Sequence, residues 1–550
     1  MLSRMTHAAM AAACARSYVR FRDQRFQLEA VQRRKLKQLL QQVASTRISP
    51  PWQGEIPSWE SFRNTYPVTR YADWQAAIRD QRQGRQNLTG SPVVRYQPTS
   101  GSSEKLKMIP YTRAFLKELD GAIGPWLASM YRRYPGLKGG AHYWSVSWLP
   151  QNQHEELRGN LNDDSELMGG AKRWLASHAQ AVSPDVALAA SPGDAMFASL
   201  CYLTARADLR MLSVWSPTFA LQMLDSLPAW GDEIVRVLSS GSWGARQPAL
   251  SSLKAPRNPA RAMVLVKALQ ESPHDAARVL WPDLALVSAW DTADASPWAE
   301  QLRQRLPQSG FEGKGLWATE GVVTIPVDGH YPLAYQSHVY EFEDLQSGRI
   351  LAPWELREGD EVSPILSGGN GLLRYQLDDR MVVSEMWGGV PCFTFLGRRN
   401  GVDLVGEKMS PDAARAALQG VASHHGLEPV TLLAMDGQGR GKSAYIAIFS
   451  QAGRTLEPIF QEQVGRDVEE ALKGHFHYAL ARDLQQLQPA TAVVVADGWQ
   501  LYQQIAMAGG MIEGNIKPEP VRKVTREAFC RVLPEPGLRL AARAEAAGAA

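Results

Sequence analysis

Residues Tyr96–Pro110, YQPTSGSSEKLKMIP, lie between a strand-like run, Val93–Tyr96, and a helix-like run that begins at Thr112. Small residues allow a backbone to curl around an anion, while hydroxyls, main-chain N–H groups and a lysine supply hydrogen-bond donors and positive charge. The residues of this kind in the stretch are Thr99, Ser100, Gly101, Ser102, Ser103, Lys105 and Lys107. The composition predicts a loop that binds a triphosphate, and a solvated turn is the alternative.

The loop is not of the Walker type, because the pattern G-x-x-x-x-G-K-[ST] does not occur in it. A second stretch, Gly437–Ser443 (GQGRGKS), is similar to that pattern, but its spacing is one residue short. It also lies between two strand-like runs, whereas a Walker loop joins a strand to a helix. We therefore interpret Gly437–Ser443 as a hairpin turn.

The composition is that of an ordinary globular protein, since 45% of the 550 residues are hydrophobic and 21% are charged. The length predicts two or more domains. A net charge of +3 argues against a strongly basic nucleic-acid binder. The four cysteines lack paired spacing, so neither a disulfide framework nor a zinc site follows, and a reducing compartment is expected. Because no stretch reaches the length of a membrane span, we expect a cytoplasmic protein without membrane or nucleic-acid partners.

Amphipathic helical runs alternate with short β-rich runs along the chain, which predicts an α/β sheet covered by helices. A first helix is expected over residues 8–46, and strands are expected at Met211–Trp215, Ala262–Val266 and Leu284–Ala289. A change of composition near Gly397–Gly401 indicates a boundary. Beyond it, the pattern predicts an α+β module with helices at 410–424 and 465–482 and strands at 431–435, 444–449 and 491–496.

A second motif suited to a nucleotide is the run Leu316–Gly321. Here an aromatic ring, Trp317, can stack an adenine, Thr319 can hydrogen-bond a phosphate or a carboxylate, and Glu320 can hold Mg²⁺. The alternative is an ordinary polar loop after a strand.

The Tyr96–Pro110 stretch resembles the phosphate loop of the acyl-acid amido synthetases of the auxin-responsive Gretchen Hagen family, which belongs to the adenylate-forming superfamily. Thr99–Ser103 and Lys107–Pro110 occupy the places of that family's Ser-Ser-Gly-Thr-Ser and Lys-Ile/Met-Pro segments, whereas Glu104–Leu106 departs from its usual glycines. Trp317–Glu320 is similar to the family's aromatic-x-[ST]-E pattern. The resemblance therefore assigns both motifs to ATP.

Two further segments resemble motifs of the family and follow the first two in the same order along the chain. Leu372–Arg380 is similar to Y-R-Y-R-x-G-D, which implies that Asp379 takes the place of the acid reaching the ribose hydroxyls of ATP. Asp378 stands where the family has a glycine. Phe395–Asn400 resembles F-x-G-R-k-[DN], which implies that Arg398 contacts the ribose or a phosphate.

The last matches lie beyond the predicted boundary. Leu404–Lys408 is similar to the V-G-E-K of bacterial relatives, which implies a bacterial-type member. Glu513–Pro518 resembles N-Q-x-K-x-P and puts Lys517 in the place of a lysine that contacts the carboxylate oxygen and the α-phosphate while the acyl-adenylate forms. The implied fold is α/β: a large multi-layer N-terminal domain, residues 1–397, with αβα sheets and a small β-barrel-like part, and a smaller, mobile α+β C-terminal domain, residues 398–550.

The resemblance implies an ATP-dependent acid–amine ligase with ATP and Mg²⁺ as cofactors. A small carboxylic acid becomes acyl-AMP with release of pyrophosphate, and an amine, expected to be that of an amino acid, then displaces AMP. Lys517 and Glu320 are the expected catalytic residues, and Glu320 is also the expected metal ligand. The expected nucleotide-binding residues are Thr99, Ser100, Gly101, Ser102, Ser103, Lys107, Trp317, Thr319, Asp379 and Arg398. A monomer is expected. Transfer of the same adenylate to coenzyme A or a carrier-protein thiol remains an alternative, as does a non-catalytic nucleotide-binding relative.

Overall fold

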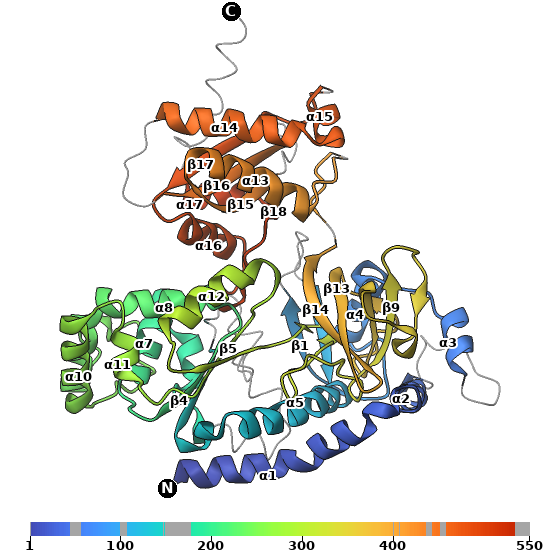
Figure 1. Ribbon diagram of the computed structural model, residues 1–550, viewed down its shortest axis with the longest axis horizontal. Helices are drawn as coiled ribbons and strands as arrows, with labels where there is room; N and C mark the ends of the chain where they lie inside the picture. The colour runs from blue at the N-terminus through green and yellow to red at the C-terminus, as the bar shows by residue number, and fades with distance from the viewer. Residues whose placement is uncertain are drawn as a thin grey trace, which may run out of the picture. The chain divides into compact units, whose positions relative to one another are not determined.

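The structure of the protein, a computed structural model, describes residues 2–43, 57–99, 107–146, 148, 178–399, 401–405, 407–435, 443–451, 458–483 and 485–533. The chain forms two compact units, and the division falls between Leu396 and Gly397. Figure 1 shows the helices and strands of both units. Each unit has a buried apolar core of its own.

The large unit contains a four-stranded parallel sheet in the order β3-β4-β5-β6. Its strands are β3 (Ala141–Trp144), β4 (Leu209–Ser213), β5 (Leu286–Ala289) and β6 (Gly310–Gly313). Most of their residues are buried, as expected for parallel strands that helices cover on both faces. Because the strands are parallel, their carboxyl ends lie along one edge of the sheet. The strands predicted at Met211–Trp215 and Leu284–Ala289 are β4 and β5, each shifted by two residues at one or both ends.

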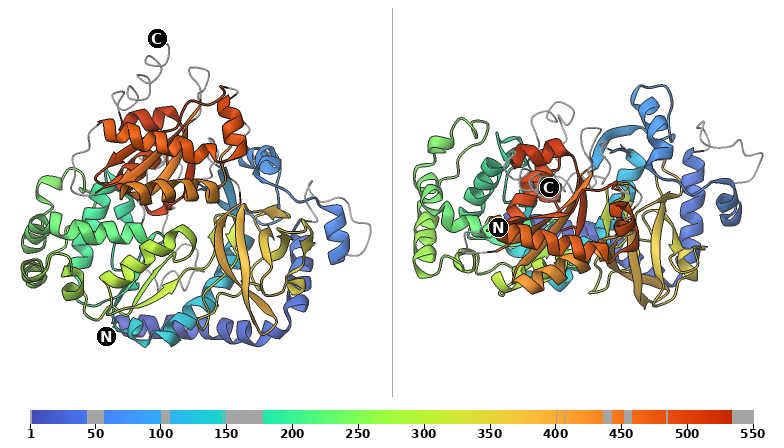
Figure 2. Two further views of the ribbon diagram at one scale, coloured as in Figure 1. Left: turned by 45° about the horizontal axis from the view of Figure 1, so that its top comes forward. Right: turned by 90° about the horizontal axis from the view of Figure 1, so that it is seen from above.

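Helices accompany this sheet in the predicted alternation. They are α5 (Arg113–Arg133), α7 (Pro192–Thr204), α8 (Pro217–Ala229), α9 (Gly231–Ser240), α10 (Pro259–Glu271), α11 (Ala276–Leu280) and α12 (Ser296–Arg305). Figure 2 shows from two further sides that the helices between residues 192 and 305 gather at one end of the large unit.

The strand predicted at Ala262–Val266 is wrong, because these residues lie inside α10. The Asn258 side chain accepts the N–H of Arg261, and Pro259 occupies the first turn, and both features favour the start of a helix. A short apolar run fits a buried helix as well as a strand. The start signals therefore outweigh the local β propensity.

A second sheet of the large unit is antiparallel and has six strands, in the order β10-β9-β11-β13-β14 with β12 paired to β11. The strands are β9 (Val339–Asp344), β10 (Ile350–Leu351), β11 (Glu361–Ser367), β12 (Tyr375–Gln376), β13 (Asp379–Trp387) and β14 (Val390–Arg398). A short separate pair consists of β7 (Trp317–Ala318) and β8 (Gly321–Val322). Together with the parallel sheet and its helices, this β-rich part confirms the predicted multi-layer α/β architecture.

The predicted phosphate loop joins two antiparallel strands, β1 (Val93–Thr99) and β2 (Lys107–Thr112), whose pairing ends at Thr99 and Lys107. Thr112 then begins α5, because its hydroxyl accepts the N–H of Phe115 at 3.1 Å. The strand predicted at Val93–Tyr96 extends to Thr99, and the predicted helix follows Thr112. Residues 100–106 lie outside the described part of the chain.

The amino-terminal segment contains α1 (Leu2–Asp23) and α2 (Leu28–Val43), separated by a 3-10 turn at Gln24–Phe26, where a single helix over 8–46 was predicted. Helix α1 lies along α5 (Figure 1). Two shorter helices follow, α3 (Trp59–Thr65) and α4 (Tyr71–Arg82). Within the described residues, none of the helices has the length and apolar character needed to span a membrane.

The small unit has one four-stranded sheet in the order β17-β16-β15-β18. Its elements are α13 (Pro411–His425), β15 (Glu428–Met435), β16 (Ala444–Ser450), α14 (Pro458–Lys473), α15 (Phe476–Asp483), β17 (Thr491–Val495), α16 (Gly498–Ala508), β18 (Val521–Val524) and α17 (Arg526–Val532). This is the predicted α+β module, except that the helix expected at 465–482 is two helices. The strands β15 and β16 pair as an antiparallel hairpin around the stretch interpreted as a turn, of which only Ser443 is described.

Candidate active site

The carboxyl edge of the parallel sheet carries a cluster of tryptophans around one lysine. Trp144 ends β3, Trp215 lies just beyond β4, and Lys314 follows β6 directly. Lys314 is only 1% exposed, and its Nζ donates a hydrogen bond of 2.6 Å to Ser213 Oγ. In open α/β sheets, ligands bind at this edge.

The Lys314 ammonium lies near three indole rings. Its Nζ is 4.8 Å from the centre of the Trp215 ring, 5.5 Å from that of Trp126 and 5.9 Å from that of Trp144. These distances fall within the range of cation–π attraction, which offsets part of the cost of burying the charge. The cluster therefore holds a desolvated positive charge between flat apolar surfaces.

Trp317, the aromatic residue of the predicted nucleotide motif, belongs to the same cluster. Its ring centre lies 5.8 Å from that of Trp126 and 6.3 Å from that of Trp215. Its Nε1–H donates to the main-chain oxygen of Lys314 at 3.1 Å. The sheet edge and the motif are thus parts of one arrangement.

A tight turn connects the sheet edge to the motif. Gly315 has a φ of +71°, and a Cβ at this position would lie 2.7 Å from the main-chain oxygen of Thr324. Only glycine fits there. The pairing of β7 with β8 then leaves Thr319 and Glu320 in the turn between them, where the Tyr111 hydroxyl donates to the Thr319 main-chain oxygen at 3.1 Å.

The Glu320 carboxylate lies among groups from three other segments. The Tyr375 hydroxyl donates to Glu320 Oε1 at 3.0 Å, and the Asn370 side chain donates to the Glu320 main-chain oxygen at 3.2 Å. Burial raises the pKa of Glu320, the positive charge of Lys107 opposes that rise, and the negative charge of Asp379 adds to it. Three of the predicted site residues, Lys107, Glu320 and Asp379, are therefore electrostatic neighbours.

Lys107 begins β2 directly after the predicted phosphate loop. Its Nζ lies 5.7 Å from the centre of the Tyr71 ring, and the Tyr71 hydroxyl accepts the Met108 N–H at 2.8 Å. The strand that follows the loop is therefore fixed to α4. Four predicted residues of the loop, Ser100, Gly101, Ser102 and Ser103, lie outside the described residues, as does the side chain of Thr99.

The two neighbouring aspartates differ in their surroundings. Asp378 Oδ1 lies 2.6 Å from Nη1 of Arg70 in an ion pair whose side chains are 37% and 49% exposed. Asp379 is the first residue of β13, and its negative charge adds to the rise in the pKa of Glu320. Asp378 thus takes part in a partly exposed ion pair, whereas Asp379 acts electrostatically on the Glu320 carboxylate. The assignment of Asp379 to the ribose stays a prediction.

The residue before Tyr375 is held in an unusual backbone conformation. Arg374 has a φ of +48°, a value that a residue with a side chain rarely adopts. Its guanidinium donates to both carboxylate oxygens of Glu341, at 2.7 Å and 3.1 Å, and to the Tyr66 main-chain oxygen at 2.6 Å. Burial raises the pKa of Glu341, and Arg374 opposes that rise. This buried bidentate pair holds Arg374 in place and thereby sets the position of Tyr375.

A largely buried carboxylate on α5, that of Glu118 with its side chain 11% exposed, supports the loop that carries Asn370. Glu118 Oε2 accepts the Gly369 N–H at 2.8 Å and lies 2.9 Å from His338 Nδ1. Because His338 Nε2 accepts the Val322 N–H at 3.2 Å, the Nδ1 atom carries the proton that Glu118 accepts. Burial alone would raise the pKa of Glu118, but Lys35 and His338 outweigh it and hold the pKa below its usual value.

A second buried carboxylate lies close to the tryptophan cluster. Glu312 on β6 is 4% exposed; its Oε1 accepts the Trp126 Nε1–H at 3.3 Å, and its Oε2 lies 3.6 Å from Arg133. Burial raises the pKa of Glu312 to about 7. Its charge therefore changes near neutral pH.

Two predicted residues come together in the small unit. Arg398 Nη1 lies 3.8 Å from Glu519 Oε1, and Arg522 Nη1 lies 2.7 Å from Glu519 Oε2. Burial alone would raise the pKa of Glu519, but Arg522, Arg398 and Lys517 outweigh it and lower the pKa. The Tyr502 hydroxyl donates a hydrogen bond of 3.2 Å to the Lys517 main-chain oxygen. Arg398 and Lys517 are thus parts of one basic group around a single carboxylate.

Several of these residues were not predicted from the sequence. For the tryptophan cluster a signal existed, because Trp215 ends one predicted strand and Trp290 follows another, at the edge where ligands bind. No local signal marks Lys314, Tyr375 or Glu118, whose surroundings arise from tertiary packing.

Comparison with known proteins identifies the family. The model of the GH3 family N-terminal domain matches residues 18–311, and that of the GH3 family central domain matches residues 331–398. The chain belongs to the GH3 family. Two solved structures resemble this GH3 protein, both at 17% identity: AtGH3.15 acyl acid amido synthetase in complex with 2,4-DB, with a TM-score of 0.71 and 95% of each chain covered, and GH3.15 acyl acid amido synthetase, with a TM-score of 0.70 and 93% of this chain and 94% of that chain covered.

At that identity, the two structural matches establish a shared fold, and the family follows from the domain matches. No curated protein sequence matches this GH3 protein at a significant level. The fold class and the family expected from the motifs are both confirmed.

Proposed function

We propose that this GH3 protein is an ATP-dependent acyl acid amido synthetase. In the first step, a carboxylate oxygen attacks the α-phosphorus of ATP, and the bond to the bridging oxygen breaks, which releases pyrophosphate and leaves acyl-AMP. In the second step, an amine attacks the acyl carbon, AMP leaves, and the amine loses a proton. AMP is a far better leaving group than the oxygen of a free carboxylate, which is why the acid must first be activated.

The observation that carries the proposal is the convergence of Lys107, Glu320 and Asp379 beside the Trp317 cluster. Lys107 follows the phosphate loop and supplies positive charge for the triphosphate, and Asp379 accepts hydrogen bonds from the ribose. Trp317 offers its ring to the adenine. Lys107, Glu320 and Asp379 come from separate segments of the chain, and their electrostatic proximity supports a shared role in binding one molecule of ATP.

The carboxylates of this group also fit Mg²⁺, a hard cation that prefers oxygen ligands. Burial is the main cause of the raised pKa of Glu320, since Lys107 opposes the rise more strongly than Asp379 adds to it. A divalent cation would favour the ionised carboxylate and so offset the cost of burying it. We assign Glu320 as the metal ligand. When bound, Mg²⁺ would neutralise charge on the phosphates as a Lewis acid. Tyr375 holds the Glu320 carboxylate in position by its hydrogen bond of 3.0 Å.

The acyl acid is expected to lie against the tryptophan cluster. Its flat apolar surfaces suit an apolar or aromatic acid, and the Lys314 ammonium suits a carboxylate. The related AtGH3.15 enzyme was solved in complex with 2,4-DB. We therefore propose a small carboxylic acid with an apolar body as the substrate class.

We further propose that residues 1–397 and 398–550 act as two domains and that the small one changes orientation between the two steps. Support comes from Gly397, whose φ of +124° is one that residues with side chains rarely adopt. Lys517 would then act in adenylation only, where its ammonium stabilises charge on the α-phosphate, with Arg398 contacting the nucleotide beside it.

The test is ATP–pyrophosphate exchange with a panel of carboxylic acids, followed by transfer from chemically made acyl-AMP to amino acids or to coenzyme A. Exchange with one acid and amide formation are expected. Thioester formation without amide would instead support an acyl-CoA ligase, and absence of exchange with every acid would point to a nucleotide-binding relative without catalysis.

Lys517→Ala separates the two steps. The variant should slow adenylation by about 10²–10³-fold, the usual effect of removing one preorganised electrostatic group, and should still convert acyl-AMP to amide at nearly the normal rate. Lys473→Ala, at a lysine of the small unit that pairs with Glu470 on the surface, is the control and should change neither step. Equal losses of both steps in Lys517→Ala would contradict the assignment.

A further inference from the structure

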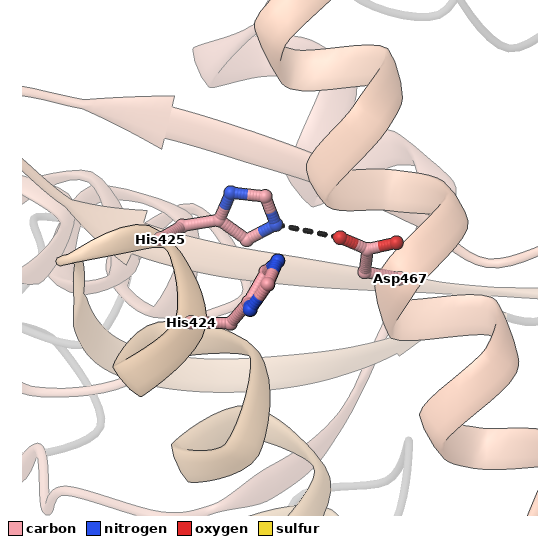
Figure 3. A group of neighbouring side chains, drawn as sticks. All are labelled: His424, His425 and Asp467. Carbon is pink, nitrogen blue, oxygen red and sulfur yellow. Dashed lines mark hydrogen bonds and ion pairs between the residues drawn. The ribbon is translucent and has the colours of Figure 1, made fainter.

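Two consecutive histidines and an aspartate converge in the small unit, and none of the three is assigned to the reaction. His424 and His425 are the last residues of α13, and Asp467 lies on α14. One potential ligand atom from each of the three side chains lies within 4.8 Å of the others. Figure 3 shows a His424 nitrogen directed towards the hydrogen bond between His425 and Asp467.

The local backbone explains why neighbouring histidines reach one point. Consecutive side chains of a continuing helix diverge by about 100°, but α13 ends here, with Gly426 in the left-handed conformation at a φ of +66°. The two imidazole rings lie perpendicular, with centres 4.8 Å apart. Helix α14 packs against α13 and presents Asp467 to the same point.

We propose that His424, His425 and Asp467 bind a divalent transition-metal ion, for which Zn²⁺ is the best fit. Two imidazoles and a carboxylate are typical zinc ligands at about 2.0–2.2 Å, and a tetrahedral ion at those lengths needs its ligands about 3.4 Å apart. His425 Nε2 and Asp467 Oδ2 are 2.6 Å apart, so these two atoms must separate slightly. The His424 nitrogen now lies within 4.8 Å of both atoms, and it must come closer where its distance exceeds the spacing that the ion needs. Because His424 is exposed, rotation of its side chain can supply the larger of these movements.

The exposure of the three side chains suits an ion that enters from solvent. His425 is 8% exposed and Asp467 is 39% exposed, and His424 is exposed. Three protein ligands leave one position for water or another small ligand. A bound ion would link α13 to α14, and we expect it to stabilise the small unit because it binds only the folded arrangement.

The alternative is that His425 and Asp467 form only an ion pair between helices, in which case His424 has no role. The experiment therefore depends on His424, whose exposed side chain can be removed without disturbing the fold. The full-length chain, without a histidine tag and after treatment with a chelator, is titrated with Zn²⁺ by calorimetry and with Co²⁺ by visible absorption.

One equivalent of metal is expected, with the strong visible bands of four-coordinate Co²⁺ and a rise of several degrees in the melting temperature. His424→Ala and Asp467→Asn should each weaken binding by about 100-fold or more, since even the loss of an outer partner of a ligand costs about 10–100-fold. His477→Ala, at another exposed histidine of the small unit, should bind as the unchanged protein does. Unchanged titration of His424→Ala, or equal weakening by His477→Ala, would overturn the proposal.

Discussion

Asp378 and Asp379 are adjacent residues of the same type, yet exchanging each for asparagine should have different consequences. Asp379→Asn removes a charge beside Glu320. Asp378→Asn removes one partner of an ion pair with Arg70. The two variants have the same change of size and charge, so each serves as the control for the other.

The magnitudes follow from the surroundings. A hydrogen bond to a charged group contributes about 1.5–3 kcal/mol, so loss of the Asp379 carboxylate should lower kcat/KM for ATP by about 10–150-fold. The Asp378–Arg70 pair has side chains 37% and 49% exposed, and such pairs contribute about 0–1 kcal/mol to stability. Asp378→Asn should therefore leave the kinetics nearly unchanged.

The pH profile provides a second, independent prediction. The negative charge of Asp379 raises the pKa of Glu320, so its removal should lower that pKa. If the Glu320 carboxylate must be ionised to hold Mg²⁺, the acidic limb of the rate profile should move to lower pH in Asp379→Asn and stay in place in Asp378→Asn.

The assay is ATP–pyrophosphate exchange as a function of ATP concentration and pH, at saturating carboxylic acid. Similar kinetic losses in both variants would refute the distinction between the aspartates. A larger loss in Asp378→Asn would reverse it. A shift of the acidic limb to higher pH in Asp379→Asn would show that the two carboxylates are not coupled as described.

Three further predictions concern the large unit. Lys314→Met should raise the KM for the carboxylic acid about tenfold or more, the loss of one charged hydrogen bond, with little change for ATP in steady-state assays, whereas Lys267→Met at a 74% exposed side chain should change neither. Burial lowers the pKa of His142 to about 3, so at this position only the unfolded chain gains a proton as the pH falls below about 6.5. The free energy of unfolding should therefore drop by about 2 kcal/mol between pH 7 and pH 5 because of His142. In urea titrations, His142→Gln should abolish this contribution to the pH dependence. Gly84 and Gly315 share a φ of +71°, but only at Gly315 would a Cβ collide with the backbone; Gly84→Ala should cost about 1–2 kcal/mol in urea unfolding and Gly315→Ala clearly more.

The elements of the fold could be predicted where local signals and tertiary environment agree. The strands on either side of Gly437–Ser443 are rich in β-formers, and they pair as the predicted hairpin. Ala262–Val266 has a similar apolar character, but the cap at Asn258 and the proline after it make the segment a helix. Apolar content alone does not distinguish a buried strand from a buried helix, whereas signals at the ends of an element do.

The candidate site could be predicted in part, for a similar reason. Lys107, Glu320 and Asp379 occur in motifs whose residue types already suggest nucleotide chemistry, and they are neighbours in the structure. Lys314 stands in no motif, and its meaning depends on indole rings contributed by distant segments. A sequence indicates which residues carry chemistry more readily than which residues surround them.

The support of Glu320 shows why these surroundings matter for the reaction. Its carboxylate is held by Tyr375, and Tyr375 follows Arg374, which the buried pair with Glu341 keeps in a rare conformation. On the other side, Glu118 binds the N–H of Gly369, next to the asparagine that holds the main chain of Glu320. The carboxylates of Glu341 and Glu118 therefore act on the same loop, from opposite ends. Neither Glu341 nor Glu118 is among the residues assigned to ATP, so the fixed position that they give to Glu320 best explains the cost of their desolvation. Electrostatic catalysis requires groups that do not need to reorganise when the charge develops.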